Sequence, residues 1–391
     1  MSYTSLNFID IDSLLTEEEI MIRQSVRDFV SDKIEPLLQN CHREEVFPHQ
    51  LIKDFGRLGL LGSSLKGYGC SEPGSELGPV AYGLTMQELE RGDSGIRSFC
   101  SVQGALVMYP IHTFGSKEQK EKFLPGLAKG DLIGCFGLTE PDAGSNPGGL
   151  KTTAKKVDGG YILNGNKMWI TNGCVADVAV VWAHVEGVIK GFIVEKDFEG
   201  FSTSTMKGKF SLRVSVTSEL HFQDCFVPDK NLLPNSQGLK SPLSCLTQAR
   251  YGISWGVLGA ANSCYKTALD YSKVREIFGK PQARYQLVQA KLSYMVQELS
   301  KAQLLSLQLG RLKEKSQLKH WQVSLGKMNN CKMALDIARI ARDMLGANGI
   351  IDEYPIMRHM LNLEAVNTYE GTEDIHKLVI GAEVTGIQSF R

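Results

Sequence analysis

A single carboxylate near the C-terminal end of the chain, Glu370, stands where it could act as a base. Tyr369 precedes it, Gly371 and Thr372 follow, and two further acids come next. Thr372 is typical of a helix N-cap, and acids in a first helical turn interact favourably with the helix dipole. We therefore expect Glu370 in a short loop directly before a helix. If an aromatic neighbour and an apolar ligand excluded water, its pKa would rise and it could take a proton from carbon. Taken alone, the residues favour a solvated glutamate in a surface turn.

The composition is that of an ordinary globular protein. Of the 391 residues 42% are hydrophobic and 22% charged, and the formal net charge is zero, which is typical of an enzyme chain with two to three domains. Zero net charge gives no general attraction to nucleic acid or anionic membranes. No apolar run approaches the roughly 18–20 residues of a membrane span, and residues 1–12 show no signal or transit pattern. We expect a cytoplasmic protein, or a mitochondrial matrix protein if the chain is a processed form, without nucleic-acid binding or a membrane span.

Metal sites and the common phosphate-binding motifs are not predicted. The nine cysteines are scattered without a Cys-x-x-Cys, and the eight histidines form no His-Glu-x-x-His. This pattern predicts reduced, mostly buried thiols rather than disulfides or a zinc site. The chain has neither a P-loop nor a strand-following Gly-x-Gly-x-x-Gly. A nucleotide cofactor would therefore have to be held in another way.

The hydrophobic periodicity changes twice along the chain, which indicates three domains. Residues 1–130 show helical periodicity. Residues 131–240 contain short apolar runs between turn residues, typical of a small antiparallel barrel or sandwich, and Asn164-Gly165 predicts a hairpin turn. Residues 241–391 contain long amphipathic helices, which usually pack as a bundle. We predict an α+β protein with an N-terminal helical domain, a central small β-barrel domain and a C-terminal four-helix bundle.

Four segments of the chain resemble, in the same order, those of the acyl-CoA dehydrogenase family of flavoproteins. These are Phe136–Pro141 with Gly144-Ser145, then Lys167–Asn172, then Arg275 to Gln286, and finally 343–349 with 369–374. The resemblance implies the family's fold, with FAD between the β domain and the helical bundle. It implies acyl-CoA as the substrate and electron-transferring flavoprotein as the partner. It also implies a homo-oligomer, usually a tetramer, in which the Arg275 stretch reaches the FAD of a neighbouring subunit.

The resemblance assigns roles to individual residues. Glu370 is implied to remove the α-proton, and its own backbone N–H to hold the thioester oxygen together with a ribityl hydroxyl of FAD. The residues implied to contact FAD are Phe136, Leu138, Thr139, Gly144, Ser145, Trp169, Ile170, Thr171, Arg275, Phe278, Gln286, Asp343, Met344, Leu345, Gly346, Ala347, Thr372 and Asp374. The residues implied to contact the substrate are Glu90, Arg97, Ser98, Ser145, Arg250, Tyr369 and Gly371. By itself, Trp169 would be interpreted as an ordinary core tryptophan. Asn146 stands where the family commonly has Asp, which keeps the turn-forming capacity but loses a charge.

Arg97 bears on the choice of acyl group. It precedes a stretch, 99–108, that we expect to form a half-buried helix. A plain fatty-acyl chain needs an apolar pocket, and burying an unpaired guanidinium there would cost several kcal/mol of free energy. An arginine suits instead a substrate whose far end is a carboxylate. A structural arginine paired with Glu90 or Asp93 is equally compatible with the residues alone.

Within the family the resemblance is closest to the subfamily that acts on glutaryl-CoA. There, the residues matching Arg97 and Ser98 bind the γ-carboxylate, and Arg250 matches a residue of the CoA-binding stretch. Tyr369 and Glu90 match residues of the members that decarboxylate glutaconyl-CoA to crotonyl-CoA. The residues are also compatible with a subfamily member that stops at glutaconyl-CoA, a dehydrogenase of short or branched acyl-CoA, an oxidase, or a silent scaffold. Arg97 argues against the short-chain dehydrogenase, and Glu370 with the flavin segments argues against the scaffold.

Overall fold

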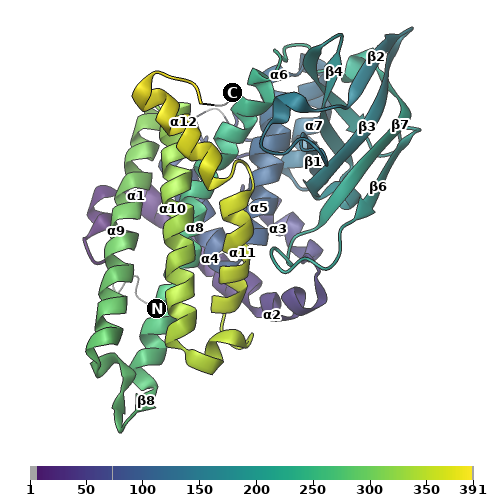
Figure 1. Ribbon diagram of the computed structural model, residues 1–391. Coiled ribbons are helices and arrows are strands. Elements are labelled where there is room, and N and C mark those ends of the chain that lie inside the picture. Colours follow the sequence, from purple (N-terminus) through teal and green to yellow (C-terminus); the bar gives the residue numbers. More distant parts are fainter. Residues whose placement is uncertain (1–6, 73, 390–391) are drawn as a thin grey trace.

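The computed structural model describes residues 7–72 and 74–389. Along the chain, one helical region precedes the β domain and another follows it; in space the helices lie together and the β domain projects to one side of the molecule (Figure 1). This arrangement confirms the predicted fold class. The helices of the first region are α1 (Glu17–Phe29), α2 (Glu35–Glu44), α3 (Ile52–Arg57), α4 (Pro79–Gly92), α5 (Ser94–Ser101), α6 (Tyr109–Phe114) and α7 (Lys117–Ala128).

Two of these helices, α4 and α5, carry candidate site residues into the core. Every residue of α5 is buried. Asp93 separates the two helices, and its side chain accepts a hydrogen bond from the Gly95 N–H at 2.7 Å, which caps α5. A π-helical segment, Val102–Met108, follows α5 directly. It is mostly buried, so the predicted half-buried helix is a buried one that changes its hydrogen-bond pattern along its length.

The β domain is a single seven-stranded sheet. Its strands are β1 (Gly134–Gly137), β2 (Thr153–Val157), β3 (Gly160–Thr171), β4 (Val178–Val185), β5 (Val188–Glu195), β6 (Phe201–Thr205) and β7 (Thr217–Pro228). Their order is β1-β4-β2-β3-β7-β6, with β5 also paired to β4. The prediction of a wholly antiparallel sheet is wrong, because β1 and β2 both pair with β4 in parallel. Alternation of apolar and polar residues indicates which face of a strand is buried, but it does not indicate whether neighbouring strands run parallel or antiparallel.

The predicted hairpin turn at Asn164-Gly165 is also wrong. Strand β3 runs through both residues, with a register shift against β7 between Leu163 and Gly165. The tight turn lies instead between β2 and β3, next to Gly159, whose φ is +73°. A Cβ atom at Gly165 would lie 2.5 Å from Oγ1 of Thr152. Glycine at this position therefore permits a close approach of another segment rather than a turn.

The C-terminal region is a bundle of long helices, with a small hairpin at one end. Its elements are α8 (Lys240–Val274), β8 (Glu276–Ile277), β9 (Lys280–Pro281), α9 (Gln286–Glu314), α10 (His320–Met344), α11 (Ile356–Thr368) and α12 (Glu373–Thr385). Helix α8 packs against both α4 and α10, so it joins the two helical regions in one hydrophobic core. The β8–β9 hairpin lies at the end of the bundle remote from the β domain (Figure 1).

In residues 7–72 and 74–389, none of the helices is long and apolar enough to cross a bilayer. Within the same ranges, no group of three or more His, Cys, Asp or Glu side chains is placed to hold a metal ion.

Candidate active site

Glu370 lies, as expected, in a short loop between two helices. The loop joins α11 to α12, and Thr372 caps α12 by accepting a hydrogen bond from the Ile375 N–H at 3.3 Å. This confirms the predicted N-cap. Glu370 itself has φ +54° and Gly371 has φ +97°. A left-handed glutamate is uncommon and costs free energy, so the surrounding contacts must hold this conformation.

The Glu370 carboxylate is shielded from water. Its Oε2 atom is buried and has no hydrogen-bond partner among the described residues, although part of the side chain remains accessible. Burial raises the pKa of Glu370 above its usual value, and the charges of Arg97, Lys327 and Arg250 oppose that rise. The local environment is thus that of a desolvated carboxylate, which a base on carbon requires, and differs from that of a solvated surface turn.

Three consecutive carbonyl groups of this loop accept hydrogen bonds from cationic side chains. Arg250 Nε, on α8, donates to the Glu370 carbonyl at 2.7 Å. Lys327 Nζ, on α10, donates to the carbonyls of Tyr369 and Gly371, both at 2.7 Å. Burial lowers the pKa of Lys327 to about 8. The loop that carries the candidate base is therefore fixed from two helices of the bundle.

Lys327 was not predicted as a site residue, although the sequence pattern around it carried a signal. The lysine lies on a buried stripe of α10, four residues after Val323 and four before Cys331, and both of these are buried. A charged residue on such a stripe needs a polar partner. His376 was also missed. It is buried below Gly371, its ring nitrogens have no partner among the described residues, and burial lowers its pKa to about 3.

Arg97 is fully buried and paired. Its Nε atom donates to Glu90 Oε2 at 2.6 Å, and its Nη2 atom donates to the hydroxyl of Tyr369. The other Glu90 oxygen accepts from the Ser94 hydroxyl at 2.9 Å. Helix α8 leaves room for the pair, because a Cβ atom at Gly256 would lie 2.2 Å from Glu90 Oε2. Arg97 is thus connected to the base loop through Tyr369.

The structure distinguishes the two structural partners that the sequence left open for Arg97. Glu90 forms the pair, whereas Asp93 binds Arg358 at 2.7 Å. Glu90 and Arg97 are both completely buried, and the adjacent Ser98 is nearly so. Five predicted substrate residues, Glu90, Arg97, Arg250, Tyr369 and Gly371, are brought together around Glu370 by these contacts. Ser145 lies exposed in the loop that follows β1.

The predicted flavin segments of the β domain meet at Trp169. The Met168 N–H donates to the Thr139 carbonyl at 2.9 Å, which joins the two segments. Trp169 has φ +63° within the register shift of β3 between Lys167 and Ile170. The shift turns its indole out of the sheet, and Trp169 is 57% exposed. The interpretation of Trp169 as a core tryptophan is therefore wrong.

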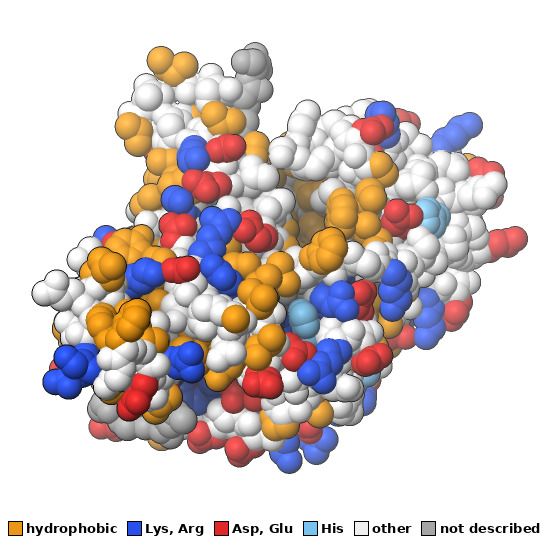
Figure 2. Space-filling view, turned by 60° about the horizontal axis from the view of Figure 1, so that its bottom comes forward, with side chains coloured by type: hydrophobic (Ala, Val, Ile, Leu, Met, Phe, Trp, Pro, Cys, Tyr) orange, Lys and Arg blue, Asp and Glu red, His pale blue; other side chains and the backbone are white. Residues whose placement is uncertain are grey.

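An exposed indole fits a planar aromatic cofactor, because its flat apolar face suits stacking of a ring system. Figure 2 shows a hollow of the surface between the protruding helix α12 and the β domain, with hydrophobic side chains on its walls. Phe136, Leu138 and Ile170 are buried in the hydrophobic core. Thr139 and Thr171 are half-buried, and Gly144 is exposed.

The remaining predicted cofactor residues lie elsewhere. Arg275, Phe278 and Gln286 belong to the β8–β9 end of the bundle, and 343–347 end α10 beside them. Gln282 Nε2 donates to the Met344 carbonyl at 2.9 Å, which joins the two segments. Figure 1 places β8 far from the β domain within one chain. Thr372 and Asp374 instead lie at the start of α12, next to the base loop. The structure therefore separates the predicted FAD residues into two groups.

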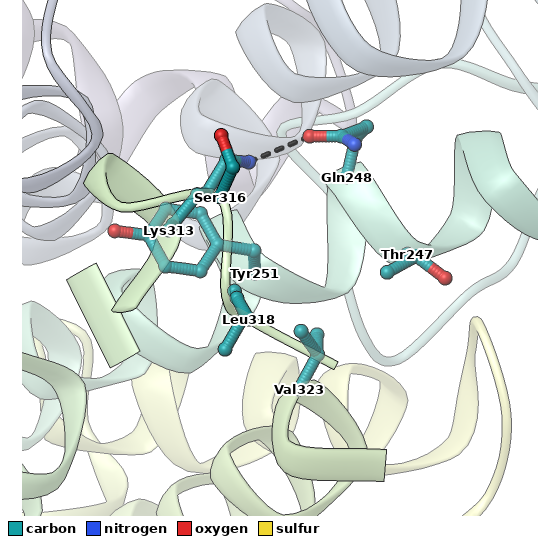
Figure 3. Close-up of a pocket in the computed structure, with 7 residues that line it drawn as sticks. All are labelled: Thr247, Gln248, Tyr251, Lys313, Ser316, Leu318 and Val323. Carbon is teal, nitrogen blue, oxygen red and sulfur yellow. Dashed lines mark hydrogen bonds between the residues drawn. The ribbon is translucent and has the colours of Figure 1, made fainter. Parts of the chain in front are cut away.

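A separate pocket of about 130 Å³ opens where α8, α9 and α10 approach one another. Figure 3 shows Lys313 in this pocket, hydrogen-bonded to Gln248 at 2.6 Å. The Lys313 ammonium also lies 4.3 Å from the centre of the Tyr251 ring, and burial lowers its pKa to about 8. None of the contacts found for Lys313 reaches the Glu370 loop, so this lysine provides a natural comparison for Lys327.

Comparisons with known proteins cover the whole of this architecture. Family models match the N-terminal domain of acyl-CoA dehydrogenase at residues 16–131, the middle domain at 135–225 and the C-terminal domain at 236–385. An acyl-CoA dehydrogenase of Bacillus subtilis (strain 168) is 35% identical over 379 residues, which are 95% of this chain and 99% of that protein. A crystal structure of glutaryl-CoA dehydrogenase from Mycobacterium smegmatis is 51% identical with a TM-score of 0.97, covering 99% of both chains. A second such structure, in complex with FADH2, is 49% identical with a TM-score of 0.97 over 100% of both chains.

Proposed function

The chain belongs to the acyl-CoA dehydrogenase family, and we propose that it oxidises glutaryl-CoA and decarboxylates the product to crotonyl-CoA. Enzymes of this family are FAD-dependent oxidoreductases. The observation that carries the glutaryl-CoA proposal is the buried guanidinium of Arg97, held by Glu90 and Tyr369 next to the Glu370 loop. Full-length similarity to a glutaryl-CoA dehydrogenase at about half identity supports it.

Glu370 is proposed to remove the α-proton of the thioester. Desolvation makes its carboxylate a stronger base than a solvated one, because the raised pKa lies closer to that of the weakly acidic carbon. The loop carbonyls are fixed by Arg250 and Lys327, so the Glu370 N–H is held in one direction. That N–H can donate to the thioester oxygen and stabilise the charge that develops there. Bound FAD would supply the acceptor for the hydride that leaves the β carbon.

Arg97 is proposed to bind the distal carboxylate. A guanidinium has five N–H donors, and the bonds to Glu90 and Tyr369 use two of them. The remaining donors and the adjacent Ser98 hydroxyl can orient the γ-carboxylate, and Glu90 fixes the plane of the guanidinium. A buried arginine in this place favours a dicarboxylic over a plain acyl chain, because an apolar chain end would leave donors unsatisfied.

Decarboxylation is proposed to follow from the same arrangement. Once the α-proton and the β-hydride have left, the bond between the γ carbon and the carboxylate breaks and CO2 departs. The electron pair of that bond passes into the conjugated thioester as a dienolate. Protonated Glu370 then returns its proton to the γ carbon, which gives crotonyl-CoA and restores the carboxylate. Tyr369 and Glu90, which contact Arg97, would hold the guanidinium as the carboxylate charge is lost.

We also propose a homotetramer that passes its electrons to electron-transferring flavoprotein. Three large apolar side chains at the β8–β9 end are strongly exposed: Val274 (78%), Phe278 (95%) and Leu287 (80%). Such apolar surfaces usually mark contacts with another chain. Arg275 and Gln286 lie in the same surface, so a neighbouring subunit placed there would bring its own cofactor within their reach.

The proposal is tested by adding glutaryl-CoA to the FAD-loaded protein without oxygen. Loss of the flavin absorbance, together with crotonyl-CoA and CO2 in equal amounts, is the expected result. Butyryl-CoA is the control, and it should bleach the flavin much more slowly. Accumulation of glutaconyl-CoA would contradict decarboxylation. Faster bleaching by butyryl-CoA would contradict recognition of a distal carboxylate.

A further inference from the structure

We infer that Lys327 is a positioning residue for the base: its buried ammonium group clamps the two peptide carbonyls on either side of Glu370. The inference rests on the proposed role of Glu370 and adds to it a residue that does not touch the reacting atoms. Lys327 is 1% exposed and comes from α10, whereas the loop follows α11. The clamp thus ties the candidate base to a neighbouring helix of the bundle.

The hydrogen bonds of Lys327 are directed to this loop. An ammonium group has three donors, and two of them reach the carbonyls of Tyr369 and Gly371 at 2.7 Å. Across residues 7–72 and 74–389, the hydrogen bonds of Lys327 Nζ reach peptide oxygens and no carboxylate. A buried ammonium normally pairs with a carboxylate. Here peptide oxygens take that place, so the charge of Lys327 remains available to the site.

The clamp explains how Glu370 keeps its unusual backbone conformation. The Tyr369 carbonyl belongs to the peptide plane that precedes Glu370, whose φ is +54°, and the Gly371 carbonyl belongs to the plane that follows Gly371, whose φ is +97°. Arg250 holds the carbonyl between them. With three successive peptide groups fixed, the direction of the Glu370 Cα–Cβ bond is fixed as well. Catalytic groups that are held in this way avoid the rate loss of about 10²-fold that accompanies a misplacement of about 1 Å.

Lys327 also affects the charge state of the base. Arg97 on α5, Arg250 on α8, Cys331 on α10 and Glu370 in the loop act on Lys327 electrostatically. Lys327 in turn lowers the pKa of His376 on α12. The charge of Lys327 lowers the pKa of Glu370 and so opposes the effect of desolvation. Loss of that charge should therefore raise the pKa of Glu370 further.

Substitution of Lys327 in the FAD-loaded enzyme separates the effect of its hydrogen bonds on the loop from the effect of its charge on the pKa of Glu370. In Lys327→Met both the hydrogen bonds and the charge are lost, so anaerobic flavin reduction by glutaryl-CoA should slow by about 10²-fold. The acid limb of its pH profile should also move to higher pH. In Lys327→Gln the amide can still donate two hydrogen bonds but carries no charge. That variant should retain most of the rate at high pH and show the same shift of the acid limb.

The matched control is Lys313→Met. Lys313 is half-buried in the bundle and also has a pKa lowered to about 8, but its contacts are with Gln248 and Tyr251 (Figure 3). This variant should keep the parent rate and pH profile. If Lys313→Met and Lys327→Met slow the reaction equally, the effect reflects general damage to the bundle and the inference is wrong.

Two further outcomes decide the matter. An unchanged rate in folded Lys327→Met with normal FAD content would overturn the positioning role, and an unchanged acid limb in Lys327→Gln would overturn the effect of the Lys327 charge on the pKa of Glu370. If Lys327→Met does not fold, Lys327→Gln and Lys327→Arg are measured in its place, and Arg should leave the acid limb unmoved because it keeps the charge. Failure of the proposed function has a different signature, since Glu370→Gln would then reduce its flavin at a near-normal rate.

Discussion

The substrate side and the flavin side of the proposed reaction centre are built in different ways. On the substrate side, Glu90, Arg97 and Tyr369 bond to one another within a single chain, and the first two are completely buried. On the flavin side, Trp169 and Phe278 are 57% and 95% exposed. They also lie in distant parts of the molecule, at the β domain and at the β8–β9 end of the bundle (Figure 1).

The difference follows from the cost of burying polar groups. A guanidinium and a carboxylate that are removed from water must find partners in the protein itself, so they are assembled without a ligand. An exposed aromatic ring has no desolvated polar group to satisfy, so it can remain exposed until a cofactor or a second chain binds. Substitutions on the substrate side should therefore change rate and specificity at full FAD content. Substitutions on the flavin side should change FAD retention and assembly.

The largest effect is expected for Glu370→Gln. The amide cannot accept the α-proton, so anaerobic flavin reduction should slow by about 10²–10⁴-fold, the usual contribution of a general base. FAD content should remain normal because Glu370 belongs to the substrate side. Stopped-flow absorbance measures the rate, and near-normal reduction would remove Glu370 from the role of base.

Arg97→Met should have the next largest effect, and it should depend on the substrate. Removal of one partner of a buried charge pair costs about 2–5 kcal/mol, here in kcat/KM for glutaryl-CoA. Butyryl-CoA should lose little, because Met suits an apolar chain end. Measurement of kcat/KM for both thioesters gives the selectivity ratio.

The control for Arg97→Met addresses the carboxylate of Glu90, which loses its partner in this variant. Glu90 would be left buried and unpaired, so the double variant Glu90→Gln/Arg97→Met should recover stability without recovering glutaryl-CoA selectivity. A selectivity ratio equal to that of the parent in either variant would make Arg97 a purely structural residue.

Arg275→Ala should act on the flavin side only. If Arg275 contacts the FAD of a neighbouring subunit, its loss removes a charged hydrogen bond, and FAD should be retained roughly tenfold more weakly. Assembly should weaken in parallel, as light scattering on dilution would show. The rate of the FAD-saturated enzyme should stay close to that of the parent. A stable monomer with full FAD content in the parent protein would contradict this view of the hairpin end.

The smallest expected effect is on the pH dependence of the parent enzyme. Only the ionised form of Glu370 accepts a proton, and burial raises its pKa above the usual value. The acid limb of kcat/KM should therefore lie above the value of about 4.3 typical of glutamate, and activity should fall as the pH drops through it. FAD content, measured over the same range, should not follow this titration. An acid limb at or below the ordinary value would indicate a solvated carboxylate.

Short-range patterns in the sequence were sufficient for several of these features. Thr372 with two acids behind it predicted the start of α12, and therefore the loop position of Glu370, because a cap depends on residues within one turn. The two changes of periodicity predicted the order of a helical, a β and a second helical region, because the spacing of core-facing apolar residues differs between helices and strands. The same reasoning failed at Asn164-Gly165, where a turn-forming dipeptide lies inside a strand.

Only the tertiary structure decided which partners the buried charges found. Arg97 donates to Tyr369 across 272 positions of sequence, and Lys327 donates to the same residue across 42. No local pattern could choose Glu90 over Asp93 for Arg97, or direct Lys327 to the loop of Glu370. These choices depend on how α4, α5, α8 and α10 pack, and packing brings together residues whose separation in sequence is arbitrary. The sequence alone determined the types of groups and the elements that carry them, whereas burial and proximity, which set their pKa values, came from the fold.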